Sequence, residues 1–353
     1  ALGERISPAQ QQRGGSRSTR LPSSLVCLFV CLFVNHDRLQ GEERARLGGI
    51  LVNSSAKIKA DAIVDFRVEL VNRLSDAGFP SIEVGEFVSP KIIPAMQGSD
   101  QVAQQIETKP DMEYSALVPN MRGFNDALKA GVKIITIFGA ATEQFSRANI
   151  NCTIEESFER FEPVVAAAKE HNIKVRGAVS CIVGCPYEGD VDAREVATLV
   201  RRFQDMGCYE IALGDSIGVG TPQSIKALIL ACEEEGVPAS VLTAHFHNTC
   251  GMALANCYAA LEMGVYVLES ACGGLGGCPN APGATGNLSS EELVYMLNGL
   301  GIETGVDLDK AVAIGRWATE AMNHRLDSKI GEAMTNPNMT YFKKVGHGVR
   351  LSA

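Results

Sequence analysis

No apolar run in the sequence is long enough to cross a membrane as a helix. The run at 25–34, LVCLFVCLFV, has ten residues, whereas a helical span needs about twenty. The sequence also lacks a block of basic residues, and its net charge of −9 argues against nucleic acid as the main partner. These absences favour a globular protein with no membrane span and no nucleic-acid partner.

The composition supports this interpretation. Apolar residues make up 46% of the chain and charged residues 21%, which are ordinary values for a globular protein with a sizeable core. A chain of 353 residues needs no disulfide to stabilise such a core. Its 11 cysteines are odd in number and scattered, which favours a reducing compartment over a disulfide framework.

The first part of the chain differs from the rest. It begins with a stretch rich in Arg, Ser and Gln, and the short apolar run follows. This order is typical of a secretory signal, and the Arg- and Ser-rich composition is typical of an organellar transit peptide. We therefore expect 1–46 to be an atypical amino-terminal segment outside the fold, 47–330 to form the structured domain, and 331–353 to be a carboxyl-terminal tail.

A repeated unit runs through the structured part. An amphipathic helix pattern ends at a glycine, and an apolar strand pattern follows at once, as at Gly78, Gly131, Gly207 and Gly264. Glycine just past a helix adopts the left-handed conformation that closes the last turn. Strands that are apolar throughout are buried on both faces, so the alternation predicts a parallel α/β fold.

The number of units predicts a closed barrel. Seven strands are expected near 81–87, 113–119, 133–140, 174–182, 210–216, 240–247 and 266–272, with an eighth near 48–53. Eight strand–helix units favour a (β/α)8 TIM barrel with an atypical first strand over an open, doubly wound sheet. No G-x-G-x-x-G follows the first strand, which weakens the dinucleotide-binding alternative. Chemistry is therefore expected at the carboxyl ends of the strands.

Two of the six histidines end one predicted strand, in LTAHFHNTCG. Residues i and i+2 of a strand face the same side, so the imidazoles of His245 and His247 should point together. Two neutral imidazoles in this arrangement are a plausible half of a divalent metal site. The alternative is two partly buried histidines, each bonded to a neighbour.

A glycine-rich loop, GGLGGCPNAPGATGN at 273–287, follows the last strand. Such a loop can fold over a ligand, and a thiol at Cys278 can donate or accept a proton there. The amide oxygen of Asn287 is a possible hard metal ligand. Two carboxylates complete the predicted mouth of the barrel: Glu83 lies in the strand SIEVGEF, and Asp215 ends the strand in IALGDS. The alternative for each is a surface or structural ion pair.

The sequence around these residues resembles the hydroxymethylglutaryl-CoA lyases, metal-dependent barrel lyases related to isopropylmalate and homocitrate synthases. The resemblance runs from about Ile63 to Lys329. It is carried by FVSPK, FGAA, NINCTIEESFERF, VSCIVGCPYEG, GCYEIALGDSIGVGTP, GLGGCP and GNLSSEELVYMLNGLG. The segment GLGGCP is similar to the active-site signature of the lyases, which the related synthases lack.

The resemblance implies a function and residue roles. It implies cleavage of 3-hydroxy-3-methylglutaryl-CoA, an acyl-CoA substrate, to acetyl-CoA and acetoacetate, as in leucine catabolism and ketone-body formation. It also implies a homodimer in the mitochondrial matrix. His245, His247 and Asn287 would bind Mg²⁺ or Mn²⁺. Cys278, Glu83, Asp215 and His245 would be the catalytic residues.

The sequence departs from the family at the first strand. The family ends that strand with an Arg-Asp-Gly turn, whose Asp binds the metal and whose Arg stabilises the enolate. Such a turn is absent here, and Ser54 and Ser55 stand roughly in its place. Glu86 replaces a usual Ser, and Ala178 replaces an aromatic residue of one branch.

The missing turn predicts impaired catalysis in the chain as written. Either the first coding segment is spliced from unrelated sequence, or the barrel has lost catalysis. The alternatives to the lyase are an inactive barrel that binds acyl-CoA or a protein partner, and a related Claisen-type acyl-CoA synthase or aldolase.

Overall fold

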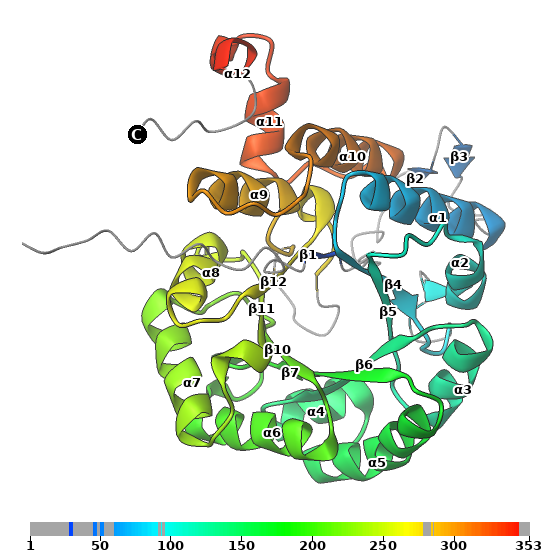
Figure 1. Ribbon diagram of the computed structural model, residues 1–353, viewed down its shortest axis with the longest axis vertical. Helices are drawn as coiled ribbons and strands as arrows, with labels where there is room; N and C mark the ends of the chain where they lie inside the picture. Colours follow the sequence, from blue (N-terminus) through cyan, green and yellow to red (C-terminus); the bar gives the residue numbers. More distant parts are fainter. Residues whose placement is uncertain are drawn as a thin grey trace, which may run out of the picture.

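The computed structural model describes residues 28–30, 45–47, 50–52 and 60–345, apart from 91–92, 94–95, 278–283 and 285, with side chains described within 63–342. Strands gather inside a ring of helices (Figure 1). The prediction of a TIM barrel is confirmed.

One parallel sheet forms the barrel, in the strand order β1-β12-β11-β10-β7-β6-β5-β4. Its first and last members, β1 and β4, also lie against each other, so the sheet curls round on itself. The strands are β1 (Leu28–Val30), β4 (Ser81–Glu86), β5 (Glu113–Leu117), β6 (Ile134–Ala140), β7 (Lys174–Ser180), β10 (Glu210–Asp215), β11 (Leu242–Phe246) and β12 (Val267–Ser270).

Seven barrel strands, β4 to β7 and β10 to β12, lie where the sequence predicts them. The predicted eighth strand is present but does not belong to the barrel sheet. The segment near 48–53 contains β3 (Ile50–Val52), which pairs antiparallel with β2 (Ala45–Leu47) outside the barrel sheet. The strand beside β12 is β1, from the apolar run that we expected to lie outside the fold. Parallel strands that are buried on both faces are typically near-continuous apolar runs. The run at 25–34 is continuous, whereas polar residues follow Val52 at once. The division of the chain at residue 46 stays a prediction.

Helices surround the barrel, and the last two of them lie beyond the ring (Figure 1). They are α1 (Ala60–Asp76), α2 (Ser99–Gln105), α3 (Met121–Lys129), α4 (Glu143–Ile150), α5 (Ile154–Glu170), α6 (Ala193–Met206), α7 (Pro222–Glu234), α8 (Ala253–Glu262), α9 (Ser290–Gly299), α10 (Leu308–Ala321), α11 (Lys329–Thr335) and α12 (Thr340–Val345). Short elements complete the set: β8 (Gly184–Cys185), β9 (Gly189–Asp190), η2 (Ala239–Val241) and η3 (Cys272–Gly274). None of the described helices is long and apolar enough to cross a membrane.

Local sequence signals set where these helices begin and end. Thr153 and Thr221 each form a capping box at the start of α5 and α7. Gly207 ends α6 in the left-handed conformation with φ 111°. Asn172 follows α5 with φ 53°, a conformation that asparagine tolerates better than most residues. The predicted role of Gly207 in ending a helix is confirmed.

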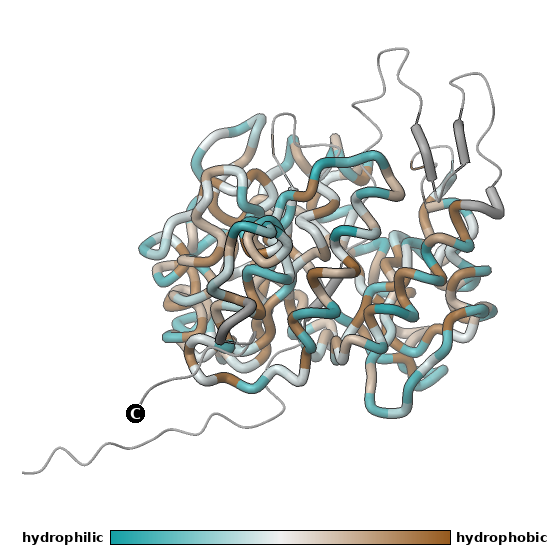
Figure 2. Tube along the Cα trace, turned by 90° about the horizontal axis from the view of Figure 1, so that it is seen from above, coloured by the Kyte–Doolittle hydropathy of each residue, from teal (hydrophilic) through white to brown (hydrophobic). Residues whose placement is uncertain are grey.

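The hydrophobic core lies between the sheet and the helices. Ile135 and Ile137 of β6 are fully buried in it, and along the outer helices hydrophobic and hydrophilic residues alternate (Figure 2). Thr136, between them, faces the barrel interior, where it pairs in register with Arg176 of β7. The interior face therefore carries polar as well as apolar residues.

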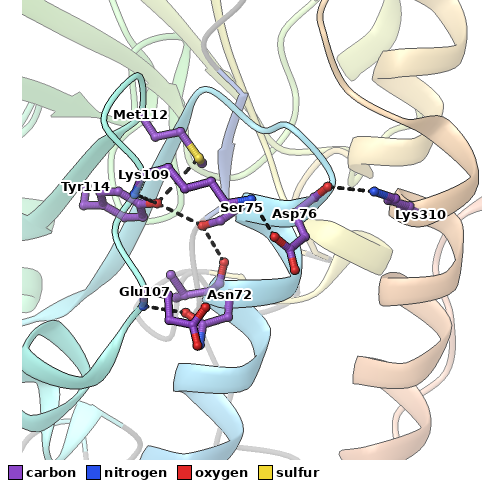
Figure 3. Close-up of polar contacts among 9 residues, drawn as sticks. Asn72, Ser75, Asp76, Glu107, Lys109, Met112, Tyr114 and Lys310 are labelled. Carbon is purple, nitrogen blue, oxygen red and sulfur yellow. Dashed lines mark hydrogen bonds and ion pairs between the residues drawn. The ribbon is translucent and has the colours of Figure 1, made fainter.

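A polar cluster ties α1 to its neighbours at the amino-terminal face of the barrel (Figure 3). The hydroxyls of Tyr114, at the start of β5, and Ser75 are 3.0 Å apart. Lys109 Nζ donates to the carboxylate of Asp76 at 2.5 Å, and Lys310 of α10 donates to the Asp76 carbonyl at 3.0 Å. This face is opposite the strand ends that carry chemistry in such barrels, so the cluster contributes to stability.

Candidate active site

His245 and His247 lie at the carboxyl end of β11. Their ring centroids are 5.4 Å apart with an interplanar angle of 66°, so the imidazoles lie together as the strand alternation predicts. The His245 side chain is 21% exposed, while His247 as a whole is 4% exposed. The pair therefore lies at the boundary between the packed barrel and its open mouth.

Asn287 joins this pair from the far end of the glycine-rich loop. It forms an isolated antiparallel bridge with His247, and its Nδ2 donates to the Leu275 carbonyl at 3.1 Å. Because the amide nitrogen is engaged by the chain, the amide oxygen is the atom left to bind a ligand. The structure thus brings together the three residues for which the sequence predicts a metal role.

The donor set fits a divalent cation. Mn²⁺ accepts two imidazoles beside an amide oxygen more readily than Mg²⁺ does, because Mg²⁺ prefers oxygen ligands throughout. The part of the chain that the structure describes holds no group of three His, Cys, Asp or Glu side chains able to bind a metal. A carboxylate ligand would therefore have to come from outside the described residues or from the substrate.

Glu83 approaches from the other side of the mouth, on β4. In the sheet order, β12 and β1 separate β4 from β11. Glu83 pairs in register with Ser115 of β5, and Glu86 pairs with Leu117 after a register shift between Glu83 and Gly85. Ser115 and Leu117 are two residues apart, so the irregularity places both carboxyl groups on the interior face.

The environment of Glu86 favours its neutral form. The residue is 3% exposed, and burial raises the pKa of its carboxyl to about 7, although the nearby charge of Arg67 opposes the rise. The guanidinium of Arg67 is bound elsewhere: its Nη2 donates to Val84 O at 3.1 Å and to Ser99 Oγ at 2.9 Å. The site therefore contains a second interior carboxyl beside Glu83.

Asp215 shapes the loop that follows β10. Its carboxylate accepts from the backbone N–H groups of Val219 at 3.2 Å and Gly220 at 2.8 Å, and its carbonyl accepts from His247 N at 3.4 Å. Burial raises its pKa, and the bonds from Gly220 and Val219 oppose the rise. These contacts suit the supporting role that the resemblance implies, while direct participation in catalysis stays a prediction.

Cys278 lies outside the described residues, but the two ends of its loop are visible. Glu291 of α9 accepts from Gly273 N at 2.8 Å and from Ser289 Oγ at 2.5 Å. One buried carboxylate thus holds the start and the end of the loop together. The sequence reasoning missed Glu291, because an acidic residue in the first turn of a helix is ordinary.

The sequence reasoning also missed a chain of charged groups inside the barrel. Glu269 of β12 lies 2.6 Å from His245 Nδ1 through Oε2, and 2.6 Å from Arg176 through Oε1. Arg176 Nε also donates to Glu210 at 2.6 Å. Burial alone would raise the pKa of Glu269, but the charge of Arg176 and the contacts with His245 outweigh it and lower the pKa to about 2. Charged residues within otherwise apolar strands were the available signal.

Comparison with known proteins places this geometry in a family. The model of the HMGL-like family matches residues 56–317. Over 267 residues the chain is 50% identical to the mitochondrial hydroxymethylglutaryl-CoA lyase of Gallus gallus, covering 76% of this chain and 89% of that protein. It is also 50% identical over 268 residues to a 3-hydroxy-3-isohexenylglutaryl-CoA/hydroxy-methylglutaryl-CoA lyase of Pseudomonas aeruginosa, with the same coverage of 76% and 89%.

A solved structure agrees with the sequence relatives. The crystal structure of hydroxymethylglutaryl-CoA lyase from Pseudomonas aeruginosa superposes with a TM-score of 0.77 at 45% identity, covering 89% of this chain and 98% of that one. Sequence and fold thus point to the same enzymes, and the chain belongs to the HMGL-like family of carbon–carbon lyases.

Proposed function

We propose that this protein cleaves 3-hydroxy-3-methylglutaryl-CoA to acetyl-CoA and acetoacetate. The observation that carries the proposal is the cluster of His245, His247 and Asn287 at the carboxyl end of the barrel, in a chain 50% identical to a lyase of this name. This edge of a TIM barrel is where catalytic groups gather.

The reaction needs a base, a charge sink and an acid. A base removes the proton of the C3 hydroxyl, and the C3–O⁻ electrons then form the ketone of acetoacetate as the C2–C3 bond breaks. The bond's electron pair moves into the thioester and gives the enolate of acetyl-CoA. A proton delivered to C2 completes acetyl-CoA. Each proton transfer of this kind typically contributes about 10²–10⁴ in rate.

Enzymes of this family depend on a divalent metal ion, and His245, His247 and Asn287 are the residues that would hold it here. Such an ion, when bound, makes a coordinated hydroxyl more acidic and orients it. We propose Mn²⁺ or Mg²⁺, with the imidazole-rich donor set favouring Mn²⁺.

The other residues have distinct proposed roles. Cys278, at the centre of the glycine-rich loop, delivers or relays the proton to C2. Glu83, on the interior face of β4, is an active-site carboxylate, and His245 takes part in proton transfer as well as metal binding. Asp215 holds the loop after β10 against the backbone of His247.

A longer substituent on C3 defines a second candidate substrate. Ala178 lies on the interior face of β7, in register with Ala212 of β10, and Gly214 stands beside His245 on the next strand. Ala178 and Ala212 contribute little side-chain volume to the barrel interior beside the histidine strand. The relative from Pseudomonas aeruginosa is named for both a methyl and an isohexenyl substrate. Comparing turnover of the two acyl-CoA thioesters would decide between them.

The absence of an Arg-Asp-Gly turn sets the expected rate. Losing one stabiliser of a developing negative charge typically costs about 10²–10³ in rate. We therefore propose that the chain as written turns over slowly, as a homodimer in the mitochondrial matrix. The relatives named mitochondrial support the compartment. The alternative, a barrel that binds acyl-CoA without cleaving it, predicts binding with no acetoacetate.

The test is acetoacetate release by the full chain with Mn²⁺, together with Mn²⁺ titration of the protein. His247→Ala should weaken Mn²⁺ binding by about tenfold or more, whereas His324→Ala, at an exposed histidine far along the chain, should not. Unchanged Mn²⁺ affinity in His247→Ala would overturn the metal assignment. Acyl-CoA binding without any product would favour the inactive barrel.

A further inference from the structure

The contacts of His245 extend inward to a buried charged chain. His245 Nδ1 and Glu269 Oε2 are 2.6 Å apart, and Glu269 Oε1 and Arg176 are 2.6 Å apart. The side chains of Arg176 and Glu269 are 3% and 6% exposed, compared with 21% for His245. This series of contacts therefore runs from Arg176 and Glu269 in the packed interior of the barrel to His245, which reaches the mouth.

The direction of hydrogen bonding along this chain follows from its chemistry. Arg176 only donates, and an ionised carboxylate only accepts. Both oxygens of Glu269 are therefore acceptors, one for Arg176 and one for His245. The hydrogen of a neutral His245 ring must then sit on Nδ1, which leaves the lone pair of Nε2 facing away from Glu269.

We propose that Glu269 and Arg176 are positioning residues: Glu269 fixes His245 as the tautomer that presents a free Nε2 to the site, and Arg176 orients Glu269. The tautomer is a property of the metal-free protein. Only its expected effect on metal affinity rests on the proposed metal role of His245. Imidazoles that bind metals commonly donate their other N–H to a carboxylate, and losing that partner costs about 10–100-fold in metal affinity.

The competing explanation is that these opposite charges only stabilise the barrel interior. Glu210 distinguishes this purely structural role from the positioning role. Glu210 also accepts from Arg176, at 2.6 Å, and its side chain is 14% exposed. Glu210 neighbours Arg176 in register on β10, whereas Glu269 neighbours His245 in register on β12. Glu210→Gln and Glu269→Gln thus each neutralise one of the two carboxylates that accept from Arg176, but only Glu269→Gln changes the partner of His245.

Glu269→Gln should move the ring hydrogen of neutral His245 from Nδ1 to Nε2, rather than only weaken the hydrogen bond at Nδ1. A glutamine has one acceptor oxygen, and Arg176 requires an acceptor, so the amide NH₂ would turn toward His245 Nδ1. A donor at that position favours the Nε2–H tautomer, whose lone pair points into the barrel. In the double variant Arg176→Met/Glu269→Gln, the amide is free to rotate and return its oxygen to His245.

The experiment measures the ¹⁵N chemical shifts of the His245 ring in the metal-free full chain, at a pH where the ring is neutral. We expect Nδ1–H in the wild type and Glu210→Gln, Nε2–H in Glu269→Gln, and recovery of Nδ1–H in the double variant. Nε2–H in the wild type, or Nδ1–H retained in Glu269→Gln, would overturn the positioning role. The wild-type measurement decides even if a variant fails to fold.

Mn²⁺ titration of the same proteins separates this inference from the proposed function. Affinity should fall about 10–100-fold in Glu269→Gln and much less in Glu210→Gln, with partial recovery in the double variant. An inverted tautomer with unchanged Mn²⁺ affinity would support the positioning role and overturn His245 as a metal ligand. Equal losses of Mn²⁺ affinity in Glu210→Gln and Glu269→Gln would support the purely structural role and overturn the proposal.

Discussion

Replacing Glu86 by Gln should raise the stability of the protein at alkaline pH and leave that stability nearly unchanged at acidic pH. Burial raises the pKa of this carboxyl from 4.5 to about 7 in the folded protein. Between these values the folded state holds a proton that the unfolded chain has released. Stability therefore falls as pH rises through the window from 4.5 to about 7, and stays low above it.

The magnitude follows from the size of the rise. Each tenfold change in the acid dissociation constant is worth about 1.4 kcal/mol, so ionised Glu86 costs about 3 kcal/mol above the window. Glutamine has nearly the same shape as the protonated acid and never ionises. It leaves the hydrogen bonds of Arg67 to Val84 and Ser99 in place.

The assay is urea unfolding of both proteins at about pH 5 and about pH 8.5, followed by fluorescence or circular dichroism. The variant should gain about 3 kcal/mol at the higher pH and about 1 kcal/mol or less at the lower one. Glu159→Gln is the matched control, because Glu159 lies on the exposed face of α5. It should shift neither curve measurably.

A stability difference between wild type and Glu86→Gln that is the same at both pH values would refute this reasoning. So would a loss of stability in the variant at the higher pH, because that would mean that the ionised carboxylate pairs favourably with Arg67 despite its burial.

Three further substitutions test other parts of the structure. Glu291→Ala leaves the buried donors at Gly273 and Ser289 unpaired and should cost about 1–3 kcal/mol for each; an unchanged melting temperature would contradict this. Cys278→Ala should leave the fold intact and slow acetoacetate release about 10²-fold or more, and near-normal turnover would make the thiol incidental. Because β1 takes the first strand position, a carboxylate ligand that follows that strand should come after Val30, and the first acidic residue there is Asp37. Asp37→Asn should weaken Mn²⁺ binding about tenfold or more, and equal affinity would exclude Asp37 as a ligand.

The sequence by itself determined most of the barrel and the shared face of its histidines. Glycines such as Gly207 end helices because their backbone adopts the left-handed conformation. Capping boxes such as that at Thr153 start helices through hydrogen bonds between residues three positions apart. The i, i+2 spacing likewise sets the direction of His245 and His247. These features were predictable because each depends on residues close together in the chain.

Only the tertiary structure decided which segment closes the barrel and what surrounds the site. Whether Leu28–Val30 or Ile50–Val52 pairs with β12 depends on a partner more than 200 residues away, and both segments are short and apolar. The register shift in β4 that turns Glu86 to the same face as Glu83 arises from pairing with β5. Glu269 meets Arg176 across 93 residues of sequence, because parallel pairing brings their strands to one interior, and no local pattern encodes that contact.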